Sequence, residues 1–101
     1  MRSMTVSKKL IEIEGQRGIL QIMLVLQRNG EILYGKLYNN KALVEISNNS
    51  TAKRALALLL KHNLINERGT EGRKAKYYCL SDKGIRVASL ISKMEKILEE
   101  S

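Results

Sequence analysis

The feature that most constrains the fold of this 101-residue chain is the segment Ile19–Leu26, which is apolar on nearly every side. A helix on a protein surface keeps a polar face, and this segment has hardly any. It also falls well short of the ~20 apolar residues that span a bilayer. The segment therefore predicts a central buried helix, ending at Asn29–Gly30 with Gly30 in the left-handed conformation. A chain of this length forms one domain, which must cover that helix.

A second helix is predicted over residues 51–62. Its apolar residues are spaced i, i+4, i+7 and i+8, which places them on one face; they are Ala52, Leu56, Leu59 and Leu60. The first turn and a half is polar and basic, whereas the last turns are almost wholly apolar. We therefore expect the N-terminal end to point outward and the C-terminal end to be embedded. Asn48–Ser50 favours a helix start, and Asn63 is a candidate cap at the other end.

A β-hairpin is predicted next, with arms at residues 64–68 and 73–80 around the glycines of Gly69–Gly72. Four basic residues cluster near its tip: Arg68, Arg73, Lys74 and Lys76. Like charges on adjacent arms repel one another, unless a polyanion neutralises them.

The last predicted helix begins at Ser81–Asp82 and continues to about Glu99. Its apolar stripe is heptad-like and consists of Val87, Leu90, Ile91, Met94, Ile97 and Leu98. About 17 residues make a helix roughly 25 Å long, so part of it should project beyond so small a domain. We expect the stripe to be a dimer interface, with packing on the chain's own core as the alternative.

The remaining segments are less regular. Residues 1–14 fit a short helix or a strand equally well, residues 31–33 form a short extended piece at best, and residues 34–40 favour a short helix. The predicted organisation is an N-terminal extension at residues 1–14, a globular domain at 15–84 and a C-terminal helix at 85–101.

Charge points to the class of partner. The net charge is +8, and residues 51–76 carry seven basic and two acidic residues. Such a basic cluster attracts polyanions. The single cysteine, Cys79, forms no internal disulfide, which agrees with a reducing compartment. Without a signal peptide or an apolar span, we expect a cytoplasmic protein that does not bind membranes.

The order helix, short helix, turn, helix, hairpin and long helix resembles the winged helix-turn-helix transcriptional regulators. The residues that carry the resemblance are Ser50–Leu56 with Leu59, then Lys61–Ile65, and finally Tyr77–Gly84 after the hairpin. Asn63 stands where the family commonly has glycine, and Ser81 where it has threonine. The MarR and PadR regulators, and small archaeal winged-helix proteins that dimerise through a C-terminal coiled coil, are similarly close. The segment Tyr34–Asn49 is longer than the usual second helix and turn.

The resemblance implies an α+β, mostly α fold, with a two-stranded wing and a long C-terminal helix. It also implies that the N-terminal end of the third helix reads the major groove, with Arg54 as the candidate for a guanine edge. The recognition-helix candidates are Asn49, Ser50, Thr51, Lys53 and Arg54. The wing candidates are Arg68, Arg73, Lys74 and Lys76.

Three functions fit these observations. The first is a homodimeric, sequence-specific regulator that binds double-stranded DNA. The second is an architectural DNA-binding protein with little sequence preference, and the third is a winged-helix module that binds other proteins. An enzyme is not expected, because the sequence has no acid–base pair, nucleophile motif or phosphate loop. No cofactor is expected, and a metal sensor would need more ligands than Cys79 and His62. The sequence does not identify a small-molecule effector.

Overall fold

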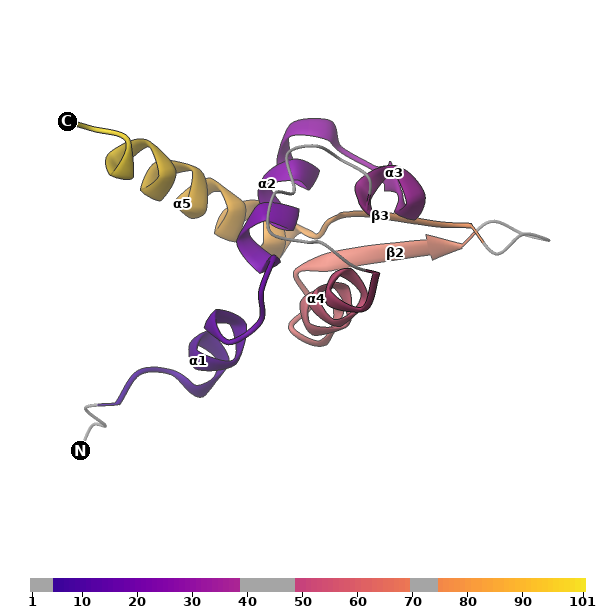
Figure 1. Ribbon diagram of the computed structural model, residues 1–101, viewed down its shortest axis with the longest axis horizontal. Helices are drawn as coiled ribbons and strands as arrows, with labels where there is room; N and C mark the ends of the chain where they lie inside the picture. Colours follow the sequence, from indigo (N-terminus) through magenta and orange to yellow (C-terminus); the bar gives the residue numbers. More distant parts are fainter. Residues whose placement is uncertain (1–4, 39–48, 70–74) are drawn as a thin grey trace.

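The computed structural model describes residues 5–38, 49–69 and 75–101. In these residues it contains helices and strands in the predicted order (Figure 1). The elements are α1 (Lys8–Glu14), α2 (Ile19–Asn29), β1 (Ile32–Leu33), α3 (Tyr34–Tyr38), α4 (Asn49–Lys61), β2 (Ile65–Gly69), β3 (Lys76–Leu80) and α5 (Asp82–Leu98).

Helix α2 is the centre of the core, which confirms the prediction made from its apolar sequence. Its buried side chains are Ile19, Ile22, Met23, Val25 and Leu26. Gly30 ends the helix at a φ of 75°, an angle that glycine adopts without strain. Its ψ of −131° lies outside the left-handed helical region, so the predicted conformation of this stop is wrong in detail.

Helix α4 turns its apolar face to the core, as its spacing predicted. Ala52, Leu56 and Leu59 are buried, and Leu60 is partly buried against the same cluster. The helix begins at Asn49, two residues before the predicted start at Thr51.

The C-terminal end of α4 is closed by Asn63, as predicted. Asn63 has a φ of 60°, and the backbone N–H groups of Asn63 and Leu64 donate to the carbonyls of Leu60 and Leu59. This pair of bonds is a Schellman motif, with asparagine at the position that usually requires glycine.

The three strands form one antiparallel sheet in the order β1-β3-β2. The hairpin was predicted, but β1 as a third strand was not, because two residues are too few to show a period. Glu67 lies opposite Tyr78, and Arg68 lies opposite Tyr77. Because side chains alternate across a sheet, Glu67 and Tyr78 share one face while Arg68 and Tyr77 share the other.

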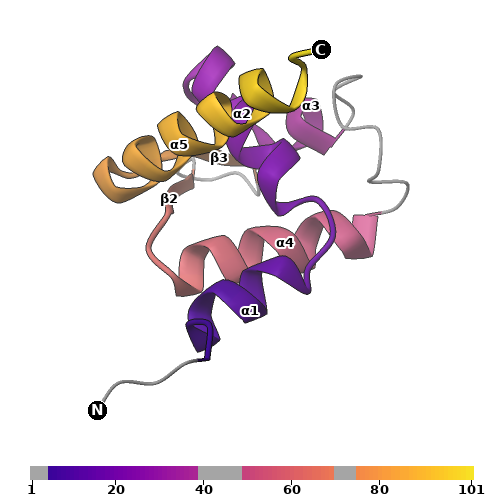
Figure 2. The same ribbon diagram turned by 90° about the vertical axis from the view of Figure 1, so that its left-hand side faces the viewer.

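The two terminal helices differ in how they are held. Helix α5 packs against α2 through Ala88 and Ile91, and its C-terminal end projects away from the sheet (Figure 1). Helix α1 has no buried residue. Turned by 90°, the structure shows α1 in front of α4 (Figure 2), and polar contacts join the two, as described below. The predicted N-terminal extension therefore includes a helix that contacts the domain.

A tight junction joins the end of α4, the base of the hairpin and the start of α5. Ser81 donates its backbone N–H to Leu64 O at 3.0 Å and its hydroxyl to Asn63 O at 2.7 Å. The same hydroxyl caps α5 by accepting from Gly84 N at 2.9 Å. A Cβ atom at Gly84 would lie 1.9 Å from Leu64 O, so only glycine fits there without a backbone shift. A division of the chain after residue 84 would pass through this junction and through the first turn of α5.

Gly84→Ala should therefore destabilise the fold. The added methyl group meets a backbone oxygen rather than a flexible side chain, so we expect a loss of about 1–3 kcal/mol in the free energy of unfolding. Urea titration followed by circular dichroism measures it. Gly35→Ala is the matched control, because nothing lies within 4 Å of a Cβ atom there. Equal stability of the two variants would contradict the close approach at Gly84.

Candidate nucleic-acid interface

A groove of about 540 Å³ lies between the N-terminal part of α4 and the hairpin. Asn49 and Lys53 line it from α4, and Lys76 lines it from β3. These elements occupy the side of the molecule opposite the free end of α5 (Figure 1). The groove therefore brings together three of the residues that the sequence predicted for DNA binding, from both the helix and the wing.

Two tyrosines form part of the groove wall. The hydroxyl of Tyr34 donates to Oδ1 of Asn49, and the rings of Tyr34 and Tyr78 meet edge to face at 6.4 Å. Tyr78 donates its hydroxyl to Glu67 at 2.8 Å. Burial and the Glu67 carboxylate raise the pKa of Tyr78, so its phenol keeps the proton that it donates. These contacts connect the first residue of α4 with the sheet.

The basic residues of the groove differ in how far their charge is compensated. Lys76 Nζ lies 3.4 Å from Glu67 Oε1. Lys53 is exposed and makes no ion pair with any residue that the structure describes. Among the lysines of this groove, Lys53 thus has the least compensated positive charge.

Arg68 lies on the opposite face of the hairpin, and its charge is already paired. Its Nε and one terminal nitrogen donate to the two carboxylate oxygens of Glu31 at 3.0 and 2.8 Å. Its guanidinium also lies 4.5 Å from the centre of the Tyr77 ring. The hydrogen bonds from Arg68 lower the pKa of Glu31, so the pair stays charged near neutrality. The neighbour of Arg68 on the adjacent strand is thus a tyrosine rather than another cation.

The other recognition-helix candidates do not all face the groove. Arg54 is exposed and lines a shallow cleft of about 440 Å³ between α4 and α1, together with Ile11 and Gln16. Ser50 is exposed at the start of α4, and Thr51 is partly buried. The wing candidates Arg73 and Lys74, and the long segment before Asn49, lie outside the described residues.

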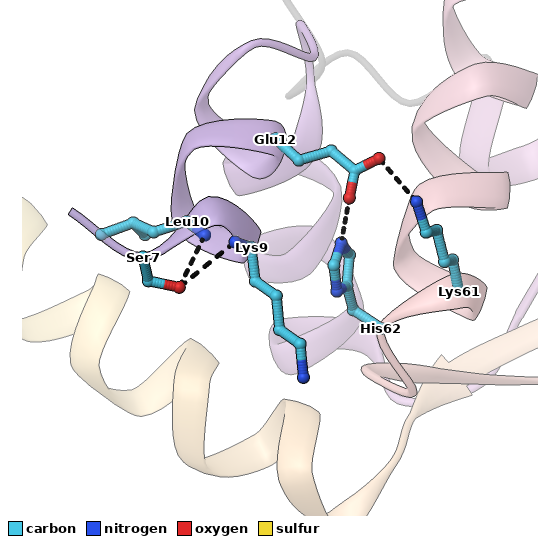
Figure 3. A network of polar contacts seen from close by, with 6 residues as sticks. All are labelled: Ser7, Lys9, Leu10, Glu12, Lys61 and His62. Atoms are coloured by element: carbon cyan, nitrogen blue, oxygen red, sulfur yellow. Dashed lines mark hydrogen bonds and ion pairs between the residues drawn. The ribbon is translucent and has the colours of Figure 1, made fainter. Parts of the chain in front are cut away.

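A carboxylate that the sequence analysis did not single out joins α1 to the end of α4 (Figure 3). Glu12 Oε2 lies 2.7 Å from Lys61 Nζ, and Glu12 Oε1 lies 2.9 Å from Nε2 of the buried His62. These two hydrogen bonds lower the pKa of Glu12. We call this group of three residues the Glu12 bracket. No local pattern could have revealed it, because the partners lie about fifty positions apart.

The predicted dimer stripe on α5 divides into two sets. Ile91 is buried and Val87 partly buried against the chain's own core. The other four side chains of the stripe are exposed: Leu90, Met94, Ile97 and Leu98. Leu90 and Met94 line an apolar groove of about 800 Å³. The lining also includes Leu10, which lies in α1, and Val6, which lies just before it. The sequence analysis did not connect α1 with this surface.

Three other findings bear on the class of the protein. Cys79 is partly buried in β3 as a free thiol. No helix in the described part of the chain is long and apolar enough to cross a membrane. Residues 5–38, 49–69 and 75–101 hold no group of three or more His, Cys, Asp or Glu side chains placed to bind a metal ion.

No family model matches the sequence, and no curated protein matches it. Solved structures are similar over nearly the whole chain. A structure described as a MarR-family transcriptional regulator from Porphyromonas gingivalis W83 has a TM-score of 0.78 at 22% identity, covering 99% of each chain. A transcriptional regulator from Clostridium thermocellum has a TM-score of 0.67 at 18% identity, covering 94% of this chain and 92% of its own.

NadR, solved in complex with 4-hydroxyphenylacetate, has a TM-score of 0.66 at 15% identity, covering 97% of this chain and 85% of its own. At these identities the likeness establishes architecture, and it confirms the fold predicted from the sequence. The chain has the winged helix-turn-helix fold, in the form found among MarR-family transcriptional regulators.

Proposed function

We propose that this protein is a transcriptional regulator that binds duplex DNA as a homodimer and reads base sequence with the N-terminal half of α4. The groove that gathers Asn49, Lys53 and Lys76 carries the proposal. It lies where a recognition helix and a wing meet DNA in winged-helix proteins, and an α-helix fits the width of the major groove. The similarity to solved transcriptional regulators supports the same conclusion.

Within this proposal, residues on α4 have distinct roles. Asn49 and Lys53 lie toward the N-terminal end of α4. In winged-helix complexes this end of the recognition helix reaches deepest into the major groove of DNA. Ser50 and Thr51 carry hydroxyl groups suited to phosphate oxygens. Arg54 follows Lys53 by one residue, about 100° further round the helix, so the two side chains address different parts of the duplex.

The wing contributes a positive charge that follows the DNA backbone. Lys76 is the described candidate, and Arg73 and Lys74 remain proposed contacts from the sequence. Arg68 is a weaker candidate than its charge suggests, because a phosphate would have to compete with the two hydrogen bonds from Glu31. We propose instead that Arg68 stabilises the sheet, because its hydrogen bonds to Glu31 join β2 to the residue just before β1.

The exposed apolar surface supports dimerisation. Leu90 is 64% exposed, and it lines the same groove as Leu10, which is 57% exposed. Ile97 and Leu98 add exposed apolar area at the end of α5. Contiguous apolar surface of this kind marks interaction sites. A second copy of the chain, related by twofold symmetry, would cover it with an identical patch and would present two recognition helices to successive major grooves about 34 Å apart.

Lys53→Ala should weaken binding to a duplex that the wild-type protein has selected from a random pool. We expect a loss of about tenfold, because a contact to a base edge or a phosphate is worth ~1–3 kcal/mol. If the contact is to phosphate, the dependence of log affinity on log salt should also flatten by about one unit. Fluorescence anisotropy at two salt concentrations measures both effects.

The matched control is Lys93→Ala, which removes an exposed lysine from α5, remote from the groove. Equal losses in both variants would show that only overall charge matters. Failure to enrich any sequence, with binding retained, would favour an architectural DNA-binding protein. Absence of DNA binding altogether would favour a protein-interaction module.

Leu90→Glu should separate the proposed dimer, since it places a charge in the apolar groove. We expect the dissociation constant to rise at least about thirtyfold, as for a central interface residue worth ~2 kcal/mol. Sedimentation velocity over a range of concentrations measures it, with circular dichroism to confirm folding. Ile85→Glu is the control, because Ile85 is also exposed on α5 but does not line the groove. A wild-type protein that stays monomeric at tens of micromolar would refute the homodimer.

A further inference from the structure

Helix α1 borders two surfaces that have different roles in the proposed function, namely the apolar groove shared with α5 and the cleft shared with α4. Leu10, together with Val6 just before the helix, lines the apolar groove shared with α5. Ile11 and Glu12 line the cleft shared with α4. One short helix therefore borders both the proposed dimer interface and the recognition helix.

The contacts that hold α1 are few and specific. None of its residues is buried, and Ile13 is its only side chain that packs, partly buried, against the described hydrophobic core. Ser7 caps its N-terminus by accepting from the backbone nitrogens of Lys9 and Leu10 (Figure 3). The cap stabilises α1 as a helix, but it does not attach α1 to the rest of the domain. The Glu12 bracket supplies the polar attachment of α1 to the end of α4.

The two halves of the bracket differ in exposure. The side chain of Lys61 is 62% exposed, whereas that of His62 is 7% exposed. Exposed ion pairs contribute little, because water and salt screen them. The contact between Glu12 and His62 is shielded from water on the histidine side, and a buried polar group that loses its partner is costly. The His62 half of the bracket should therefore carry most of the attachment.

We infer that Glu12 is a positioning residue for DNA recognition. By binding Lys61 and His62, it fixes α1 against the C-terminal end of α4, so that a partner subunit seated on α1 holds the recognition helix in one orientation. This inference rests on the proposed function and adds a residue and a coupling that the proposal does not contain. Glu12 touches no DNA in this scheme, since the bracket lies at the opposite end of α4 from Asn49.

The test compares Glu12→Ala with Glu14→Ala, because a glutamine at position 12 could keep the hydrogen bonds to Lys61 and His62. Both variants remove one negative charge from α1. Glu14 has no hydrogen bond or ion pair with a described residue and it borders the apolar groove, so its variant also controls for effects on assembly. Simple electrostatics predicts slightly tighter DNA binding for both, because each variant becomes more positive. We expect Glu12→Ala instead to bind the selected duplex about fivefold more weakly than Glu14→Ala, at protein concentrations where sedimentation shows both to be dimers.

Amide hydrogen exchange without DNA provides an independent measurement. Loss of the bracket should raise exchange rates several-fold in α1 and in the last turn of α4, because both depend on local opening. Glu14→Ala should leave both segments as in the wild type. Lys61→Met should have a smaller effect than Glu12→Ala, since it removes only the exposed half of the bracket.

Equal DNA affinities of the two variants would overturn the inference, and so would unchanged exchange at the end of α4. Weaker binding by Glu12→Ala that disappears once both variants are fully dimeric would overturn it too, since Glu12 would then act on assembly alone. If the wild-type protein selects no duplex, the proposed function fails and the positioning role fails with it. The exchange data would still show, in that case, whether the bracket joins α1 to α4.

Discussion

The close approach of Gly84 to the carbonyl of Leu64 is the constraint on which the arrangement of the interface depends. At this point the end of α4, the base of the hairpin and the first turn of α5 pass within van der Waals contact. Ser81 satisfies backbone groups on both sides, and Asn63 turns the chain out of α4 at a positive φ. Because the three elements meet there, close contacts to the backbone fix the angle between α4 and the hairpin.

Elements with a strong local period could be predicted from the sequence, whereas contacts between distant segments could not. The apolar run of α2 and the spacing of Ala52, Leu56 and Leu59 determined which faces are buried, and the structure agrees. Strand β1 escaped because two residues carry no period, and it exists only because β3 offers it a partner. The pairs Arg68–Glu31 and Glu12–His62 join residues that no spacing rule connects. Arg68, a wing candidate for DNA binding in the sequence, is therefore paired with a carboxylate in the fold.

The same comparison changes the meaning of the net charge. Residues 51–76 carry seven basic and two acidic residues, from which the sequence analysis predicted a basic cluster that attracts polyanions. In the folded chain, Arg68 and Lys61 are paired with carboxylates, and Lys76 lies near Glu67. Lys53 and Arg54 have no such partner among the described residues, and both lie in the exposed first turns of α4. Within the described part of residues 51–76, the positive charge without a carboxylate partner therefore lies in the first turns of α4, which is the helix proposed to contact DNA.

Helix α1 shows why assembly and recognition cannot be separated in this fold if it acts as a dimer on DNA. A helix of seven residues without a buried side chain has little stability of its own, so its position follows whichever surfaces hold it. One of those surfaces is the apolar groove shared with α5, which a second copy of the chain could cover. The other is the contact with α4, which includes the hydrogen bond between Glu12 and His62, one residue beyond the end of that helix. In the proposed dimer, a partner that seats α1 would also complete the support of α4, so the free energy of dimerisation would contribute to how firmly the proposed recognition helix is held.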